Sequence, residues 1–190
     1  LGLNTAFADL NKKVPGQTII GTLDYHFTPF FSGGIELQKG TLSGGDKIND
    51  PHLRFFKNSY SAFSVNSKVQ LGQFINFESS NFLYAIRGLY GGIGVGLINN
   101  NNTDIVRVKP DGSEYVFPGE DKSSGIYIPV NLGMNVNILD RWGYTRFIVN
   151  VNYQLGVTTG EGLDGYNDAA KGGAFSKIPD MYGMFSAGVK

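Results

Sequence analysis

The residues of this chain that could do acid–base chemistry are few, and the most suggestive pair lies on one segment. Asp24 and His26 are two positions apart in an alternating stretch, so both side chains would point the same way from a strand. A catalytic site would also need a nucleophile beside them, and Ser32 or Ser64 could serve. We favour the simpler interpretation, a hydrogen-bonded structural histidine near a turn.

The sequence gives little support for a metal-binding site or a nucleotide-binding site. The chain has no cysteine and two histidines, and the second, His52, follows a proline in a polar stretch, which disfavours a zinc site. The glycines of residues 91–96 resemble a nucleotide-binding loop, but the Lys-Ser/Thr that ends such a loop is missing. Three acidic residues of polar stretches could hold a cation, although their spacing lacks the full calcium-loop pattern: Asp121, Asp164 and Asp168. The sequence therefore predicts no catalytic residue, no cofactor and no metal site.

The strongest pattern is a long stretch with two faces, from Ile126 to Ile138. Its apolar face consists of Ile126, Ile128, Val130, Leu132, Met134, Val136 and Ile138. Its other face consists of Tyr127, Pro129, Asn131, Gly133, Asn135 and Asn137. Alternation with a period of two is typical of a strand, and this strand is far longer than the usual length of about five or six residues. One apolar and one Asn-rich face suit a wall between hydrocarbon and a polar interior.

Seven further strand-like segments surround this one. Together the eight are Leu1–Asp9, Gln17–Phe27, Phe31–Leu42, Ser59–Phe74, Phe82–Ile98, Ile126–Ile138, Tyr144–Thr158 and Met181–Lys190. Short links (28–30, 74–81 and 140–143) alternate with longer ones (10–16, 43–58, 99–124 and 160–180), as in outer-membrane barrels. The prediction is an all-β fold: an eight-stranded antiparallel up-and-down transmembrane β-barrel, with residues 1–190 forming a single domain.

Composition agrees with a barrel and excludes other classes. Sixteen basic residues balance sixteen acidic ones, so the electrostatic footprint of a nucleic-acid-binding protein is absent. Glycine is abundant, at 27 residues, and charged residues make up 17% of the chain, against roughly 25% in soluble domains. No run of 18 apolar residues predicts a transmembrane helix, and no signal peptide is present, so an exported protein would be represented here in its mature form.

An eight-stranded barrel has an interior just wide enough for side chains, so we expect a filled lumen. The polar network predicted there comprises Asp24, His26, Glu36, Lys68, Asn131, Asn135, Arg146, Asn150 and Asn152. Because an unpaired buried charge is unfavourable, Lys68 and Arg146 should bond Asp24 and Glu36 in some combination.

The outer face should carry lipid-facing and interfacial residues. Lipid-facing positions are the apolar row of 126–138 together with Val149 and Val151. Aromatic belts are expected at both membrane interfaces. At the short-turn ends they would include Tyr25, Phe27, Phe31, Trp142 and Tyr144, and near the loop ends Tyr60, Phe63 and Tyr127. A β-sandwich core lined with Phe and Tyr is the alternative, but sandwich strands are shorter, at roughly five or six residues.

The run Leu23–Glu36, in which an aromatic-Thr-Pro turn joins two alternating segments, and the Gly-Thr-Leu-Ser-Gly-Gly of 40–45 resemble the second and third strands of small outer-membrane barrels. The resemblance is to the OmpA/OmpX-like β-barrel family and covers the chain as an architecture. It implies insertion into the outer membrane of a Gram-negative bacterium, with extracellular loops and both termini periplasmic. Such barrels commonly end on an aromatic residue, whereas this chain ends Gly188-Val189-Lys190, so a few residues or a further domain would follow.

The function expected from these features is that of a non-enzymatic integral outer-membrane barrel, a structural or accessory subunit or anchor. Its partners would be outer-membrane lipid and lipopolysaccharide, and other outer-membrane proteins in a larger complex, but no nucleic acid. A narrow channel, an outer-membrane enzyme acting on lipid or peptide, and a soluble lipocalin-like binder are the alternatives.

Overall fold

Alternating apolar and polar residues run along nearly every strand, and the structure sorts them to the two sides of one closed sheet. The computed structural model describes residues 1–7, 13–46, 55–106, 121–159, 162–165 and 180–189. The long strands among them are β1 (Gly2–Phe7), β3 (Gly16–His26), β4 (Phe31–Gly45), β5 (Phe55–Gln70), β6 (Leu89–Ile105), β7 (Lys122–Leu139), β8 (Thr145–Thr158) and β9 (Met181–Val189). A two-residue strand, β2 (Lys13–Val14), lies beside the end of β4.

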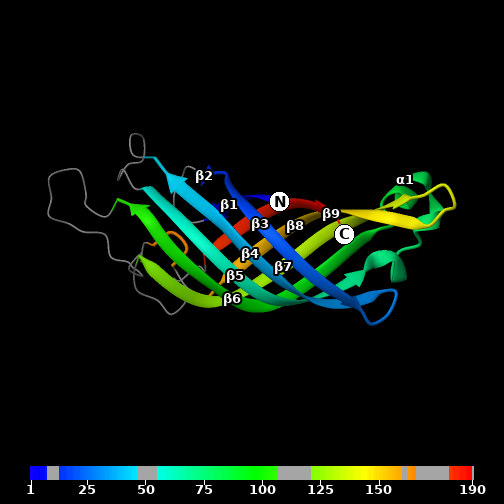
Figure 1. Cartoon of the computed structure of the whole chain (residues 1–190), viewed down its shortest axis with the longest axis horizontal. Helices are drawn as coiled ribbons and strands as arrows, with labels where there is room; N and C mark the ends of the chain where they lie inside the picture. The colour runs from blue at the N-terminus through cyan, green and yellow to red at the C-terminus, as the bar shows by residue number, and fades with distance from the viewer. Residues whose placement is uncertain (8–12, 47–54, 107–120, 160–161, 166–179, 190) are drawn as a thin grey trace.

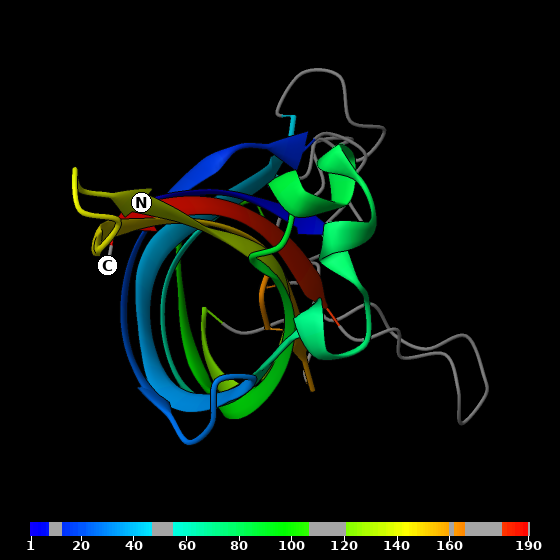
Figure 2. The same ribbon diagram turned by 90° about the vertical axis from the view of Figure 1, so that its right-hand side faces the viewer.

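The long strands close into a barrel. From β3 to β9 each pairs antiparallel with the next along the chain, and β1 pairs with both β3 and β9, which joins the two edges of the sheet. Figures 1 and 2 show the resulting tilted cylinder from the side and from one end. The predicted all-β class and the eight-stranded antiparallel up-and-down barrel are confirmed for the described residues.

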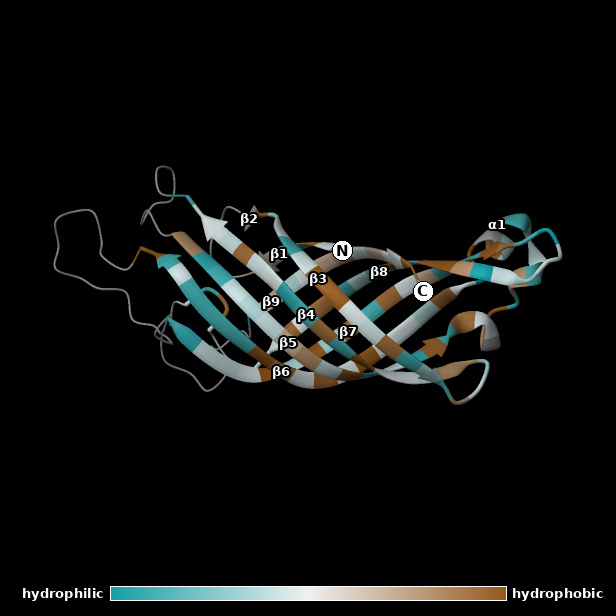
Figure 3. Ribbon diagram, in the orientation of Figure 1, coloured by the Kyte–Doolittle hydropathy of each residue, from teal (hydrophilic) through white to brown (hydrophobic). Residues whose placement is uncertain are grey.

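The predicted facing of β7 is reproduced. Ile126, Val130 and Leu132 are exposed on the outer surface, whereas Tyr127 and Asn131 between them are buried inside. Figure 3 shows the same alternation of hydrophobic and hydrophilic residues along the other strands. The wall therefore has an apolar outside and a largely polar inside, the reverse of a soluble β-sandwich.

The two ends of the barrel differ. At the turn end, the four-residue segment 27–30 joins β3 to β4 and the segment 140–144 joins β7 to β8. At the loop end, longer connections join β4 to β5, β6 to β7 and β8 to β9. Several strands continue further toward the loop end than predicted: Asn99–Asn102, expected in a loop, pairs with 58–61 of β5 and 122–124 of β7 within the sheet.

The predicted fifth strand, Phe82–Ile98, is wrong over its first half. Residues 71–88 form a long connection at the turn end, with 3₁₀ turns η1 (Leu71–Gln73) and η2 (Phe77–Ser79) and a short helix α1 (Asn81–Ala85). The Oγ of Ser80 accepts a hydrogen bond from the Leu83 N–H at 3.2 Å and caps this helix. The predicted short link at 74–81 is therefore wrong as well. None of the described helices is long and apolar enough to cross a bilayer.

Candidate functional site in the barrel interior

A layer of aromatic rings closes the middle of the barrel. Tyr60 of β5, Tyr127 of β7 and Tyr182 of β9 all point inward and are at most 1% exposed. The rings of Tyr127 and Tyr182 are stacked, with centroids 5.8 Å apart and planes 8° from parallel, and Tyr60 lies 5.3 Å from Tyr182. We call these three residues the tyrosine layer. They come from strands far apart in the sequence and meet because the barrel is narrow.

Two glutamines accept hydrogen bonds from two of the three hydroxyl groups of the tyrosine layer. Tyr182 donates to Oε1 of Gln38 at 2.9 Å, and Tyr127 donates to Oε1 of Gln154 at 2.8 Å. Nε2 of Gln38 in turn donates to Oε1 of Gln154 at 2.6 Å. On the other side, the hydroxyl of Tyr60 forms hydrogen bonds with Thr18 and Asn4. The layer is thus both packed and satisfied in hydrogen bonds, which is what a buried polar cluster needs for stability.

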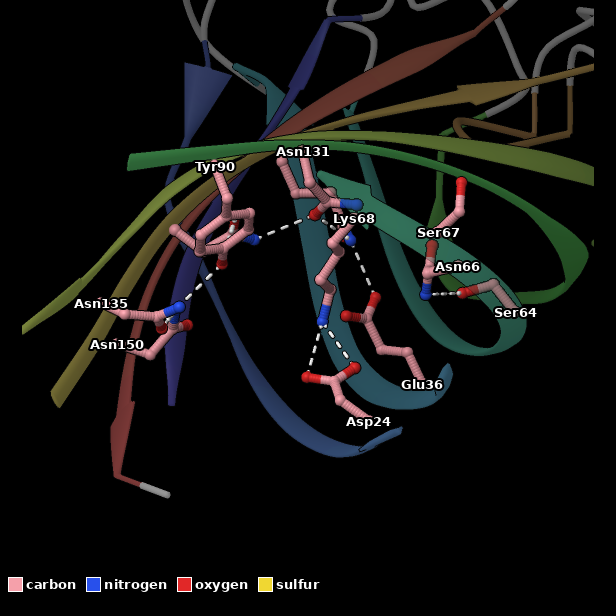
Figure 4. A network of polar contacts seen from close by, with 12 residues as sticks. Asp24, Glu36, Ser64, Asn66, Ser67, Lys68, Tyr90, Asn131, Asn135 and Asn150 are labelled. Atoms are coloured by element: carbon pink, nitrogen blue, oxygen red, sulfur yellow. Dashed lines mark hydrogen bonds and ion pairs between the residues drawn. The ribbon is translucent and has the colours of Figure 1, made fainter. Parts of the chain in front are cut away.

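Charged residues lie on the turn side of the tyrosine layer, since Lys68 follows Tyr60 along β5 toward the turn end. Figure 4 shows Asp24, Glu36 and Lys68. Nζ of Lys68 bonds both carboxylate oxygens of Asp24, at 2.8 and 3.0 Å. The buried carboxylate of Glu36 instead accepts from two amides, Nε2 of Gln38 and Nε2 of Gln154, each at 2.7 Å. The structure thus brings Lys68 to Asp24, one of the predicted combinations, and surrounds Glu36 with neutral donors.

Asparagines continue the network toward the turn end. Asn152 donates to Oδ1 of Asn131 at 3.0 Å and accepts from the hydroxyl of Tyr90 at 3.2 Å. Asn150 donates to the Tyr90 hydroxyl and to Oδ1 of Asn135, both at 2.9 Å. The four asparagines of the predicted network are therefore joined through Tyr90, a residue that the sequence analysis did not single out (Figure 4).

Of the predicted lumen residues, Arg146 lies outside the lumen and His26 lies at its open turn end. Arg146 is 63% exposed at the turn end, where its Nε lies 3.3 Å from Oδ2 of Asp140, so its expected pairing with Asp24 or Glu36 is wrong. Arg146 is the extra residue at a break in the β7–β8 register, where Ile138 pairs with Phe147 and Leu139 with Thr145, so the inward parity of β8 does not extend to it. His26, the last residue of β3 and opposite Ser32 in register, is exposed but lines the same cavity as Asp24 and Lys68. Both oxygens of Asp24 are engaged by Lys68, so this carboxylate serves as the counter-ion of an ammonium group.

The aromatic residues predicted to form interfacial belts are exposed at the turn end, and only in part at the loop end. Tyr25, Phe27, Phe31, Trp142 and Tyr144 are all exposed there, and Tyr25 packs edge-on against Phe27 at 5.0 Å. At the loop end Phe63 is exposed, but Tyr60 and Tyr127 point inward, so their assignment to a belt is wrong. The inward facing of both tyrosines could be predicted from the alternation along each strand. Tyr60 has the same parity as the inward Lys68, and Tyr127 has the same parity as the inward Asn131.

The loop end of the interior is filled by residues of the β8–β9 connection. Leu163 is fully buried there, and its carbonyl accepts from Nδ2 of Asn58 at 2.8 Å. Its N–H donates to Oδ2 of Asp180 at 3.0 Å. Leu163 extends the apolar cluster formed by Leu42, Phe56 and Ile98 above the tyrosine layer. The described interior is thus closed toward the loop end.

The turn half of the interior is open by comparison. A cavity of about 570 Å³ lies next to the Lys68–Asp24 pair and is bordered by Tyr90, Asn150 and the ends of β3 and β9. Among the described residues no group of three or more His, Asp and Glu side chains could hold a metal ion. Asp164 is buried and Asp121 is exposed, while Asp168 and His52 lie outside the described residues.

The positions predicted to face lipid lie on the outer surface. Ile126, Val130, Leu132, Val136 and Ile138 are exposed, and Ile128, Met134, Val149 and Val151 are half-exposed between neighbouring side chains. No protein-family model, no curated protein and no solved structure matches this chain.

Proposed function

We propose that this protein is an integral outer-membrane β-barrel that acts as an anchor or accessory subunit. The observation that carries the proposal is the outer surface. Large apolar side chains are exposed on strands all around the cylinder, including Leu23, Leu37, Val65, Val95, Leu132 and Phe185. Soluble monomers rarely expose contiguous apolar patches larger than a few hundred Å², so this surface favours hydrocarbon as its surroundings.

The extent of the apolar surface suits a bilayer. On β7 it runs from Ile126 to Ile138, and thirteen residues of a strand tilted by about 40° rise about 30 Å. The hydrocarbon core of a bilayer is also about 30 Å thick. Beyond this belt, toward the loop end, outward positions become polar, with Lys39, Lys57, Ser61 and Asn101. Exposed aromatic residues border the belt at the turn end. This arrangement supports extracellular loops and a periplasmic turn end.

The filled interior favours anchoring over transport. Because the tyrosine layer and Leu163 close the described lumen, we propose that the barrel conducts no ions and serves as a support for its loops and outer wall. Outer-membrane lipid and lipopolysaccharide would surround it, and other outer-membrane proteins would contact it in a larger complex. We propose no enzymatic activity. The likeness to the OmpA/OmpX-like barrels remains an architectural one within this proposal.

Reconstitution into lipid vesicles tests the proposal. The folded barrel should insert, migrate faster than the heat-denatured chain on a gel, and leave planar-bilayer conductance at background. The variant Tyr182→Ala removes the central ring of the tyrosine layer and should raise conductance above background, which serves as the positive control. A protein that remains monomeric in detergent-free buffer would contradict membrane insertion. Steady conductance by the unaltered barrel would contradict the anchoring role and favour a channel.

A further inference from the structure

The outer wall changes from apolar to polar between two neighbouring rows of the sheet. On three adjacent strands, large apolar side chains that are neighbours in register are exposed on the outer face: Leu37, Phe63 and Leu97. Two residues nearer the loop end, the same strands carry the exposed Lys39, Ser61 and Asn99, which are again neighbours in register. In a bilayer, such a border corresponds to the level at which acyl chains end and lipid headgroups begin.

Lys39 is the cationic residue of this polar row. It lies opposite Ile19 of β3 on one side and opposite Ser61 of β5 on the other. Along the outer face of β4, Leu37 precedes it and Thr41 follows it. None of these four neighbours is acidic, so an anionic group of a bound molecule would meet a positive charge at this point of the wall.

A groove of about 770 Å³ lies in the outer wall beside Lys39. Exposed apolar side chains of three adjacent strands line one part of it: Leu3 of β1, Ile19 of β3 and Phe185 of β9. Polar side chains line the other part: Gln17, Lys39, Thr41 and Ser59. The groove lies over paired strands, since Leu3 is opposite both Gln17 and Phe185 in register.

Backbone forms the floor of the groove. Thr18 and Gly40 line it and pair with each other in the sheet. The side chain of Thr18 is turned to the lumen, where its Oγ1 bonds Asn4 and Tyr60. A Cβ on Gly40 would meet the same Oγ1, so Gly40 also has its side-chain position on the inside. Because these floor residues are already paired within the sheet, the groove suits a flexible apolar chain better than an added strand.

We propose that the groove binds one phosphorylated lipid of the leaflet at the loop end. Its phosphate would contact Lys39, and one acyl chain would lie along Leu3, Ile19 and Phe185. This inference rests on the proposed function, because only a membrane presents an acyl chain and a phosphate to the wall together. An ammonium group binds phosphate as a point charge, and the hydroxyl groups of Thr41 and Ser59 can donate to the remaining oxygens.

The order of the two parts of the groove favours a lipid over other occupants. On β3, Gln17 lies on the loop side of Ile19, and the outward row continues toward the turn end with Leu23. On β4, Thr41 lies on the loop side of Lys39, and the outward row continues toward the turn end with Leu37. Apolar and polar parts thus follow one another in the direction in which an acyl chain leads to its headgroup.

Native mass spectrometry of the full chain tests the phosphate contact. The barrel is released from non-ionic detergent micelles that contain equal amounts of phosphatidic acid and of diacylglycerol with the same acyl chains, so the two lipids differ in the phosphate alone. The unaltered barrel should retain one phosphatidic acid with a preference of at least about tenfold. Lys39→Gln should reduce this preference to about twofold or less. The absence of a preference in the unaltered barrel, or an unchanged preference in Lys39→Gln, would overturn the proposal.

Two control variants separate the site from net charge. Lys57 is also exposed on the outer face, but it lies four residues nearer the loop end than Ser61, about 13 Å along β5, and opposite Asp104 in register. Lys57→Gln should therefore keep the preference within about twofold of the unaltered barrel. Lys39→Arg should keep it as well, because the positive charge remains. A loss in Lys57→Gln as large as in Lys39→Gln would overturn the proposal.

Glycerol 3-phosphate, a headgroup without acyl chains, distinguishes lipid phosphate from free phosphate. It should displace phosphatidic acid only at a concentration at least about 100-fold higher than that of a competing lipid, because it leaves the apolar part of the groove empty. Displacement at equal concentrations would show that the acyl chain contributes nothing and would overturn the assignment to a lipid.

Gel mobility and vesicle insertion are measured on the same variants, all of which change exposed side chains. A barrel that folds and inserts into vesicles but shows no preference for phosphatidic acid would refute the lipid site alone. A chain that remains soluble without detergent would refute the membrane assignment, whatever lipid it retains.

Discussion

The ammonium group of Lys68 and the carboxylate of Asp24 meet across an intervening strand. Asp24 lies on β3 and Lys68 on β5, and both oxygens of Asp24 lie within 3.0 Å of Nζ. Between them on β4 lies Gly34, opposite Asp24 in register. A Cβ on Gly34 would press on the Asp24 carboxylate and the Leu23 carbonyl. The absence of a side chain at Gly34 therefore leaves the space in which the ion pair forms.

Removal of one partner of this ion pair should destabilise the barrel. Lys68→Met removes the ammonium group that both carboxylate oxygens of Asp24 contact, and we expect a loss of about 2–4 kcal/mol in the free energy of unfolding. The free energy of unfolding of the double variant Asp24→Asn/Lys68→Met should fall by less than the sum of the decreases in the two single variants, because the two side chains interact with each other. Urea unfolding in micelles measures all four proteins. Additive losses would show that the two groups do not interact.

The tyrosine layer should be sensitive to one added methyl group. A Cβ on Gly156 would lie 2.6 Å from the Tyr127 ring and 2.7 Å from the Tyr182 ring, both of which are buried. We expect Gly156→Ala to lower the free energy of unfolding by about 1–3 kcal/mol through overpacking. Gly91→Ala is the matched control, because a Cβ there meets nothing within 4 Å. Equal stability of the two variants would contradict the packing described here.

A charge on the outer wall should be unfavourable in proportion to its depth in the bilayer. Leu132→Arg, halfway along the apolar belt of β7, should destabilise the barrel in vesicles by about 2–4 kcal/mol. Ile138→Arg, on the same outer face at the turn-end limit of the belt, should destabilise it by no more than about 1 kcal/mol. Both side chains are exposed, at 54% and 45%. If water surrounded the barrel, both changes would fall within about 0.5 kcal/mol.

The β7–β8 turn should stabilise the barrel in a pH-dependent way through Asp140. Partial desolvation opposes ionisation of this carboxyl, but the backbone N–H groups of Tyr144 and Trp142 and the side chain of Arg146 outweigh it, so the pKa of Asp140 is lowered. A lowered pKa gives stabilisation that is present above the ordinary value of 3.8 and lost as the pH falls through the lowered value.

The variant Asp140→Asn tests this dependence. It should be less stable than the unaltered protein at neutral pH, and the difference should vanish at a pH well below 3.8. Fluorescence of Trp142, the single tryptophan of the chain, reports unfolding at each pH. A stability difference that stays constant from neutral to acidic pH would show that the charge of Asp140 does not contribute.

Strand periodicity was sufficient to predict the barrel and the facing of its residues. Apolar and polar side chains alternate with period two, and a closed wall has only two sides, so the row from Ile126 to Ile138 and the inward Asn131 could both be assigned from parity. The same local rule failed at Phe82, where the Ser80 side chain caps a helical turn that alternation does not reveal.

What only the tertiary structure decided is which inward residues meet. Tyr60, Tyr127 and Tyr182 lie on three different strands, and their stacking depends on barrel diameter and stagger. Arg146 has the sequence parity of a lumen residue, yet it lies at a break in the β7–β8 register next to the turn and reaches Asp140 instead. Parity depends on the local backbone alone and can be read along the chain, whereas height and neighbours across the lumen depend on how all eight strands close.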